Sequence, residues 1–258
     1  MAITFRTESI VIKKEPWREV DRLYTLYTRR AGKLKVLARG SRKFESKLAA
    51  HMEPFLISDV MIARGKQFDK LAGSEQVSAY ARIDKDLSKL AILNYCFEVL
   101  DSLTSFGQRD DKTFDLVKEL LEIVEQNHLS LEHGSSLPRV FVLKLLAQLG
   151  YKPELNQCLE CKRDARGPEF FFNSGRGGIL CGACARQPKN QAFEQTQMSG
   201  QARQALKQWH DAGLFEFLRA DLQKDTVQYL NDIVDDFLKY HIEKELKSEA
   251  YLREVVGV

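Results

Sequence analysis

Four of the five cysteines form two pairs whose spacing suits a metal ion. Cys158 and Cys161 make one C-x-x-C pair, Cys181 and Cys184 make the other, and 19 residues separate the two pairs. A two-residue turn directs both sulfurs of a pair toward one ion, and the intervening loop brings the second pair round to complete a tetrahedron. Because four thiolates leave no position for water, the pattern predicts one structural Zn²⁺ per chain and no catalytic metal.

The residues alone leave two other interpretations of these cysteines open. Each pair could be a redox-active dithiol, or all four could be buried thiols whose spacing is coincidental. The separation of the pairs lies within the range of four-cysteine zinc sites, which favours zinc. Cys96 lies among apolar residues in a helical pattern and is predicted to belong to the core.

A second group of residues could bind a polyanion. Residues 29–47 contain eight basic residues and one acid, Glu45. In a strand over 33–39, alternation places Lys33, Lys35 and Arg39 opposite the apolar residues, so these cations should face solvent. Phe44 is available to stack on a base. The residues predicted to bind nucleic acid are Arg29, Arg30, Lys33, Lys35, Arg39, Arg42, Lys43, Phe44 and Lys47. A solvated basic face without a ligand is the alternative.

Motifs that mark common enzymes are missing from the sequence. It contains no G-x-x-x-x-G-K-[ST], no H-E-x-x-H, no G-x-S-x-G and no pair of acidic nuclease motifs. The glycines of Gly175-Arg176-Gly177-Gly178 lie between the cysteine pairs, which explains them better than phosphate binding does. We therefore expect no catalytic residues and a protein that is not an enzyme.

The basic residues lie in a region that is predicted to form strands. Residues 9–12, 23–28 and 34–38 are short and rich in β-branched and aromatic residues, and further strands fit 55–62 and 67–71. Five strands in about 75 residues, without a helical period, predict a small closed barrel. An oligonucleotide/oligosaccharide-binding barrel (OB-fold) is favoured, and an SH3-like barrel is the alternative.

After residue 81 the apolar residues recur at helical spacing. Helices are predicted over 84–106, from Asp110 or Asp111 to 127, from Pro138 to Leu149 with Gly150 as the stop, over 199–211 and across 225–255. The cysteines fall in a loop-rich insert at about 152–192. The expected fold class is α+β, with a five-stranded OB-fold barrel at 1–80. An all-helical domain with an embedded four-cysteine zinc motif follows at 81–258.

Composition and charge narrow the class of protein. The 258 residues are 44% hydrophobic and 29% charged, and no stretch approaches the roughly 18 apolar residues of a membrane span. Residues 1–80 contain 16 basic and 9 acidic residues, whereas the remainder contains 23 and 27. These values argue against a membrane protein, a disulfide scaffold and a disordered chain, and they favour a polyanionic partner for the N-terminal region.

Several short runs along the chain together match a known family. They are Ile10-Val11-Ile12, the run from Asp21 to Thr28, Gly32-Lys33, Ala38-Arg39-Gly40-Ser41-Arg42-Lys43, Ser46-Lys47-Leu48 and Glu53-Pro54-Phe55. With the run from Leu137 into Gly150-Tyr151 and the four-cysteine insert, the chain resembles the RecO family of bacterial recombination mediators over its whole length. Glu249 departs from the pattern, because family members commonly carry Arg there.

The resemblance implies a non-enzymatic factor in DNA repair and recombination. Such a protein binds single- and double-stranded DNA, anneals complementary strands and works with the partner RecR. It also binds the acidic C-terminal tail of single-stranded-DNA-binding protein (SSB) and so helps to load the recombinase RecA. The expected location is the bacterial cytoplasm, associated with the nucleoid, with no membrane partner. An RNA-binding or transcription-associated OB/zinc-ribbon protein is the alternative function.

The implied SSB tail would need an apolar cleft and a cation for its terminal carboxylate. Arg139 lies in the first turn of the helix predicted from Pro138, where the backbone dipole also favours an anion. Phe141, Val142 and Leu145 are candidates for the wall of the cleft. The alternative is that these three residues belong to the core and that Arg139 is a solvated surface charge.

Overall fold

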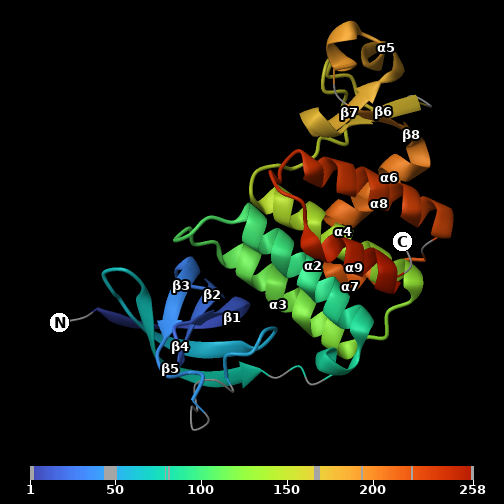
Figure 1. Cartoon of the computed structure of the whole chain (residues 1–258). Coiled ribbons are helices and arrows are strands. Elements are labelled where there is room, and N and C mark those ends of the chain that lie inside the picture. The colour runs from blue at the N-terminus through green and yellow to red at the C-terminus, as the bar shows by residue number, and fades with distance from the viewer. Residues whose placement is uncertain are drawn as a thin grey trace. The chain divides into compact units, whose positions relative to one another are not determined.

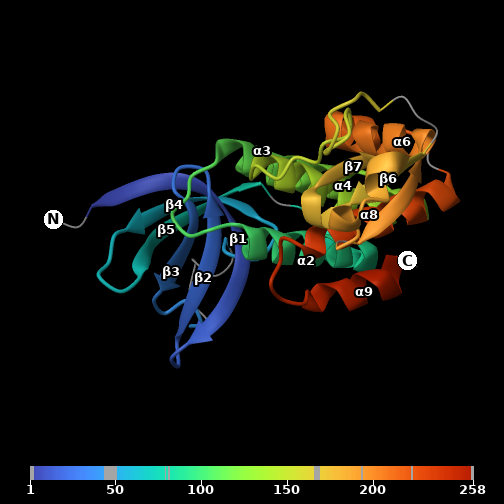
Figure 2. The same cartoon turned by 90° about the horizontal axis from the view of Figure 1, so that it is seen from above.

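A computed structural model describes residues 3–43, 51–78, 80, 82–165, 169–192, 194–221 and 223–256. Contacts divide the chain into two compact units, Met1–Gln126 and Asn127–Val258. Figures 1 and 2 show the elements of both units in two views. Within the described ranges, no helix is long and apolar enough to cross a membrane.

The first unit begins with a closed barrel of five strands. They are β1 (Thr4–Trp17), β2 (Asp21–Thr28), β3 (Gly32–Ala38), β4 (Ile57–Ala63) and β5 (Asp69–Ser78). The order is β1-β2-β3-β5-β4, and β1 also pairs with β4 to close the barrel. All pairs are antiparallel except β3–β5. This order confirms the predicted OB-fold over the SH3-like alternative.

The long strand β1 closes the barrel because it bends. Its first half pairs with β4 and its second half pairs with β2. The register against β2 shifts between Val11 and Lys13, and this β-bulge bends the strand. Apolar side chains from every strand fill the interior, among them Tyr24, Leu26, Val36 and Ile62. Each of these four is fully buried, as alternation along the strands requires.

Two helices complete the first unit, α2 (Leu87–Leu103) and α3 (Asp111–Gln126). Asp86 caps α2 by accepting hydrogen bonds from the backbone N–H groups of Ser88 and Lys89. The contacts within the chain place both helices in the same compact unit as the barrel. The domain boundary predicted at residue 80 stays a prediction.

The second unit contains α4 (Leu131–Gln148), α6 (Gly200–Asp211), α7 (Leu214–Phe217), α8 (Lys224–Lys239) and α9 (Lys247–Val256). The predicted start of α4 at Pro138 is wrong, because the helix begins seven residues earlier and is capped by the hydroxyl of Ser130. Pro138 lies inside the helix. An internal proline costs about 3 kcal/mol, and here every residue from Gly134 to Leu143 is buried, so tertiary packing outweighs the local cost.

Two further details differ from the predicted helices. The stretch predicted across 225–255 is two helices, α8 and α9, although residues 240–246 contain neither Gly nor Pro to break it. The insert is also not simply loop-rich. It contains α5 (Gly182–Ala185), β6 (Glu169–Asn173) and β7 (Gly178–Cys181). The two strands form an antiparallel sheet with β8 (Gln195–Ser199), which follows the insert, in the order β7-β6-β8. Phe172 of this sheet packs edge-to-face on Phe237 of α8, with ring centroids 5.7 Å apart.

Candidate metal centre and nucleic-acid interface

The two cysteine pairs meet in the second unit. Cys158 and Cys161 lie in the segment before β6, Cys181 ends β7, and Cys184 lies in α5. All four Sγ atoms lie within 4.8 Å of one another, and those of Cys161 and Cys181 are 4.0 Å apart. Sulfurs around a zinc ion are about 3.8 Å apart, given tetrahedral Zn–S bonds of about 2.3 Å. The arrangement is therefore able to hold a metal ion.

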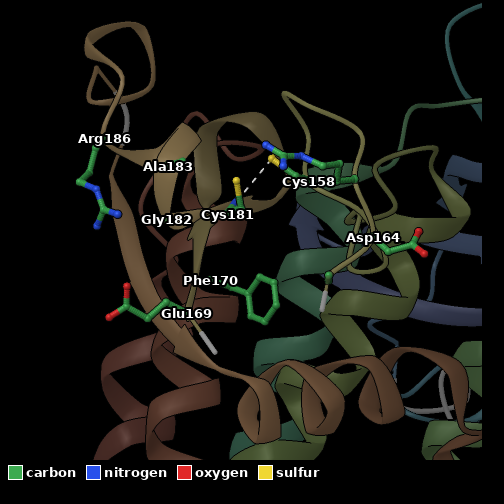
Figure 3. Close-up of a pocket in the computed structure, with 10 residues that line it drawn as sticks. Cys158, Asp164, Glu169, Phe170, Cys181, Gly182, Ala183 and Arg186 are labelled. Atoms are coloured by element: carbon green, nitrogen blue, oxygen red, sulfur yellow. Dashed lines mark hydrogen bonds between the residues drawn. The ribbon is translucent and has the colours of Figure 1, made fainter. Parts of the chain in front are cut away.

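Backbone hydrogen bonds fix the geometry of the first pair. Lys162 has φ 58°, and its N–H donates to the Cys158 carbonyl at 3.0 Å, which closes the turn between the two cysteines. The Cys181 N–H donates to Cys158 Sγ at 3.4 Å, the dashed line in Figure 3. An N–H group aimed at sulfur favours the thiolate, which is the form that binds metal.

The cysteines differ in the pKa of their thiols. Hydrogen bonds from the backbone and the side chain of Arg163 lower the pKa of Cys161 from 9.0 to about 6. Burial is the main cause that raises the pKa of Cys184 to about 12. A divalent cation bound here would compensate the cost of a buried thiolate at Cys184, since metal binding displaces the thiol proton.

A pocket of about 380 Å³ opens beside the cysteine cluster (Figure 3). Cys158 and Cys181 border it, together with Phe170 and the basic residues Arg163 and Arg186. Two of the four cysteines therefore line a pocket that is large enough for small solutes. The five cysteines of the chain all lie among the described residues, and none of them forms a disulfide.

Five of the predicted nucleic-acid-binding residues are exposed in the first unit. They are Arg30, Lys35, Arg39, Arg42 and Lys43. Alternation in β3 is as expected here, because Lys35 faces solvent while the flanking Leu34 and Val36 are buried. Phe44 and Lys47 lie outside the described residues.

Lys33 is not on a solvent-facing surface, and that expectation is wrong. The residue is only 4% exposed, and its Nζ donates to the Asp101 carbonyl at 2.6 Å and to Asp101 Oδ1 at 3.1 Å. Strand alternation does turn Lys33 away from the barrel interior, but the end of α2 covers that face. Sequence periodicity contains no information about that cover.

Arg29 is also partly withdrawn from solvent. Its Nε donates to Glu8 at 2.7 Å, its Nη2 lies 2.8 Å from Asp115, and its guanidinium is 4.5 Å from the centre of the Phe114 ring. Two carboxylates thus already compensate its charge. Arg29 is consequently a weaker candidate for an external polyanion than the exposed cations.

Sequence analysis missed residues that gather at one mouth of the barrel. The register brings the end of β1, the start of β2, the end of β3 and the start of β5 together there. The rings of Trp17 and Phe68 pack edge-to-face across this mouth, with centroids 5.3 Å apart. The Arg42 N–H donates to the Val20 carbonyl at 3.0 Å, which ties the segment after β3 to the β1–β2 turn.

Exposed cations lie around this aromatic pair. They come from the turns and strand ends at the mouth, and they are Arg18, Arg39, Arg42, Lys43, Lys66 and Lys70. Two carboxylates in the same region are already engaged, because Asp21 accepts the Gly40 N–H and Asp69 pairs with Arg64. The strand order of the predicted barrel was a usable signal for these residues, since it places the β1–β2 and β4–β5 turns together.

The residues predicted to receive a peptide tail are all buried in the second unit. Phe141, Val142 and Leu145 are fully buried, and so is Arg139. The Arg139 guanidinium is paired with Asp235 and also donates to the Ser135 carbonyl at 3.0 Å. The alternative of a solvated surface charge is wrong. A role in binding a carboxylate would need an accessible guanidinium, which this structure does not offer.

Both parts of the chain match protein families. The family described as Recombination protein O N terminal matches residues 1–80, and the family described as Recombination protein O C terminal matches residues 84–250. The two matches together cover nearly the whole chain. Their boundary follows β5 and precedes α2.

Relatives of similar length carry a common name. A protein of Pelotomaculum thermopropionicum called DNA repair protein RecO is 29% identical over 251 residues, which is 96% of this chain and 93% of that protein. A protein of the same name from Desulforudis audaxviator is 29% identical over 253 residues, 97% of each chain. One from Thermoanaerobacter sp. is 26% identical over 251 residues, 96% of each.

Proposed function

The chain belongs to the recombination protein O family, and on that premise we propose that it acts in DNA repair as a non-enzymatic factor that binds DNA and anneals complementary strands. The observation that carries this proposal is the set of exposed cations around Trp17 and Phe68 at one mouth of the barrel. Cations attract phosphates, and aromatic rings stack on unpaired bases. That combination suits single strands, and the cations also suit a duplex.

Annealing would follow from charge neutralisation. Two complementary strands repel each other through their phosphates, and a protein surface that replaces the condensed counterions lowers this repulsion. The exposed cations at the barrel mouth would hold both backbones while the bases pair. This mechanism forms no covalent bond and requires no catalytic group.

We propose that the four clustered cysteines bind one Zn²⁺ with a structural role. The donor set is entirely thiolate, and the four Sγ atoms are already close enough for a tetrahedral ion. Such an ion would fix the segment that holds Cys158 and Cys161 against β7 and α5. Metal binding and local folding are coupled in sites of this kind, so loss of the ion should loosen the insert.

The proposal also includes partners that recombination mediators use. RecR, the acidic SSB tail and, indirectly, RecA are assigned to this chain on the family relation alone. Recognition of the tail is not assigned to Arg139, because its guanidinium is buried and already paired. The barrel at 1–80 is proposed as the DNA-binding domain, and the helices with the insert as the region for partners.

An annealing assay on naked and SSB-coated complementary oligonucleotides tests the proposal. We expect the protein to accelerate annealing in both cases and to bind single-stranded DNA more tightly than RNA of the same sequence. Changing Arg39, Arg42 and Lys43 together to Glu should abolish the acceleration. A control with Lys152, Lys239 and Lys244 changed to Glu has the same net charge and should anneal normally. Equal activity of both variants, or a preference for RNA, would contradict the proposal.

A further inference from the structure

Phe106 lies beside the barrel although it follows α2 in the sequence. It forms a parallel bridge with Lys33, and the Gly107 N–H donates to the Lys33 carbonyl at 2.9 Å. The other edge of β3 is occupied by β2, and β5 pairs with β3 only at Val36 and Leu37. The segment after α2 therefore covers the part of the β3 edge that β5 leaves open. Figure 1 shows this segment reaching the start of β3.

The backbone around Phe106 is held firmly. Thr104 caps the end of α2, with its N–H donating to the Leu100 carbonyl at 3.1 Å. On the barrel side, Gly32 has φ 64°, and a Cβ there would lie 1.9 Å from the Gln108 carbonyl oxygen. Only glycine allows such a close approach. The Phe106 ring is consequently presented from a fixed segment, which lowers the entropy cost of binding to it.

The surroundings of the ring are cationic, and much of it faces solvent. Phe106 is 54% exposed, and its ring centre lies 4.7 Å from Lys33 Nζ and 6.0 Å from Lys35 Nζ. Lys33 is compensated by Asp101, whereas Lys35 is exposed. A ring that served only the core would be buried. A fixed and exposed ring next to an exposed cation suits a strand whose base stacks while its phosphate meets the cation.

We propose that Phe106 stacks on an unpaired base of a DNA strand whose phosphate contacts Lys35. This inference rests on the proposed function, since it adds a contact to the DNA-binding surface of the barrel. It makes part of that surface selective for single strands, because a paired base is already stacked in its helix. It also means that a segment beyond residue 80 extends the surface from the mouth where β3 ends toward the start of β3.

The test compares Phe106→Ala with Phe106→Tyr in the full chain, using three probes of one length. The probes are a single strand, the same strand with abasic sites throughout, and a blunt duplex. Phe106→Ala should weaken single-strand binding by roughly 5- to 150-fold, the range for one lost stacking contact. Affinities for the abasic strand and the duplex should not change. Phe106→Tyr should bind like the parent, and so should Leu131→Ala, which removes another exposed apolar side chain.

The salt dependence gives an independent readout. Because stacking releases no counterions, Phe106→Ala should leave the slope of log K against log salt unchanged on single strands. Equal loss on the abasic strand would overturn the stacking assignment, as would unchanged single-strand affinity in Phe106→Ala. If either of these results is found but the triple variant at Arg39, Arg42 and Lys43 still loses binding, the proposed function holds and only this inference fails. If the triple variant also binds normally, the proposed function itself fails.

Discussion

Arg139 and Asp235 form a two-point ion pair in the core of the second unit. Nε donates to Oδ1 at 3.0 Å and Nη2 donates to Oδ2 at 2.8 Å, and both side chains are almost completely buried. Arg253 of α9 reaches the same Asp235 Oδ2 at 3.2 Å and pairs with Glu249 at 2.9 Å. Alternating charges thus join α4, α8 and α9, and Glu249 has a partner within this chain.

The first prediction concerns this pair. Asp235→Asn should lower the free energy of unfolding by about 3–5 kcal/mol, because it leaves Arg139 charged and buried without its carboxylate. Urea unfolding measures the change. Asp236→Asn is the matched control, since its partner Lys239 is exposed, and it should cost at most about 0.5 kcal/mol. Combining Arg139→Met with Asp235→Leu should recover most of the loss. Equal cost for the two Asn variants would refute the prediction.

The second prediction separates two neighbouring lysines of β3. Lys33→Ala should lower the free energy of unfolding by about 1–3 kcal/mol, because Asp101 loses a buried partner, and should not change the salt slope of DNA binding. Lys35→Ala should lower that slope by about 0.7 on single strands, which corresponds to the loss of one phosphate contact. It should change the free energy of unfolding little. Salt titrations and denaturation of both variants check this. A reduced slope in Lys33→Ala alone would contradict it.

The third prediction compares two glycines with left-handed backbone. Alanine at Gly107 meets nothing within 4 Å, so Gly107→Ala should cost only the left-handed conformation, about 1–2 kcal/mol. Gly32→Ala carries the same cost and also collides with the Gln108 carbonyl, so it should destabilise the first unit more. Thermal unfolding ranks the two variants. The reverse order would show that the segment after α2 does not pack on Gly32.

The fourth prediction concerns metal content. Protein purified without chelators or oxidants should contain about one zinc per chain, and Cys158→Ser should lose it, because the remaining three thiolates form an incomplete tetrahedron. Atomic absorption measures the content. Cys96→Ala is the matched control, since Cys96 is buried in α2 away from the cluster, and should retain zinc. Zinc-free parent protein would refute the site.

The fifth prediction is a pH dependence at His241. Burial lowers the pKa of this imidazole below 6.5, and its ring lies between Tyr151 and Phe237 at 4.5 and 4.8 Å. As the pH falls, the imidazole is therefore protonated in the unfolded chain before it is protonated in the folded chain. The stability that neutral His241 contributes is present above about pH 6.5 and is lost as the pH falls below that value. His241→Phe should lose less stability than the parent between about pH 7.5 and 5.5, measured by thermal unfolding. His128→Gln, at an exposed position, should behave like the parent.

Local features of the sequence were enough for the barrel strands, for most of the helices and for the cysteine cluster. Strand alternation in residues such as Leu34, Lys35 and Val36 follows from the pleat, and Asp86 begins a helix by capping its first N–H groups. The two C-x-x-C pairs come together because each turn is local and the intervening loop is short. In all these cases the interaction that matters spans few residues.

Only the tertiary structure decided which charged residues are exposed and able to bind a ligand. Lys33 and Arg139 look like surface cations in the sequence, but Asp101 and Asp235, 68 and 96 residues away, hold them in buried pairs. Pro138 lies inside a helix for a similar reason, since burial outweighs local propensity. Phe106 and Lys33 are likewise brought together by chain topology. Burial and long-range pairing depend on how the elements pack, and sequence periodicity reports only the face on which a residue lies.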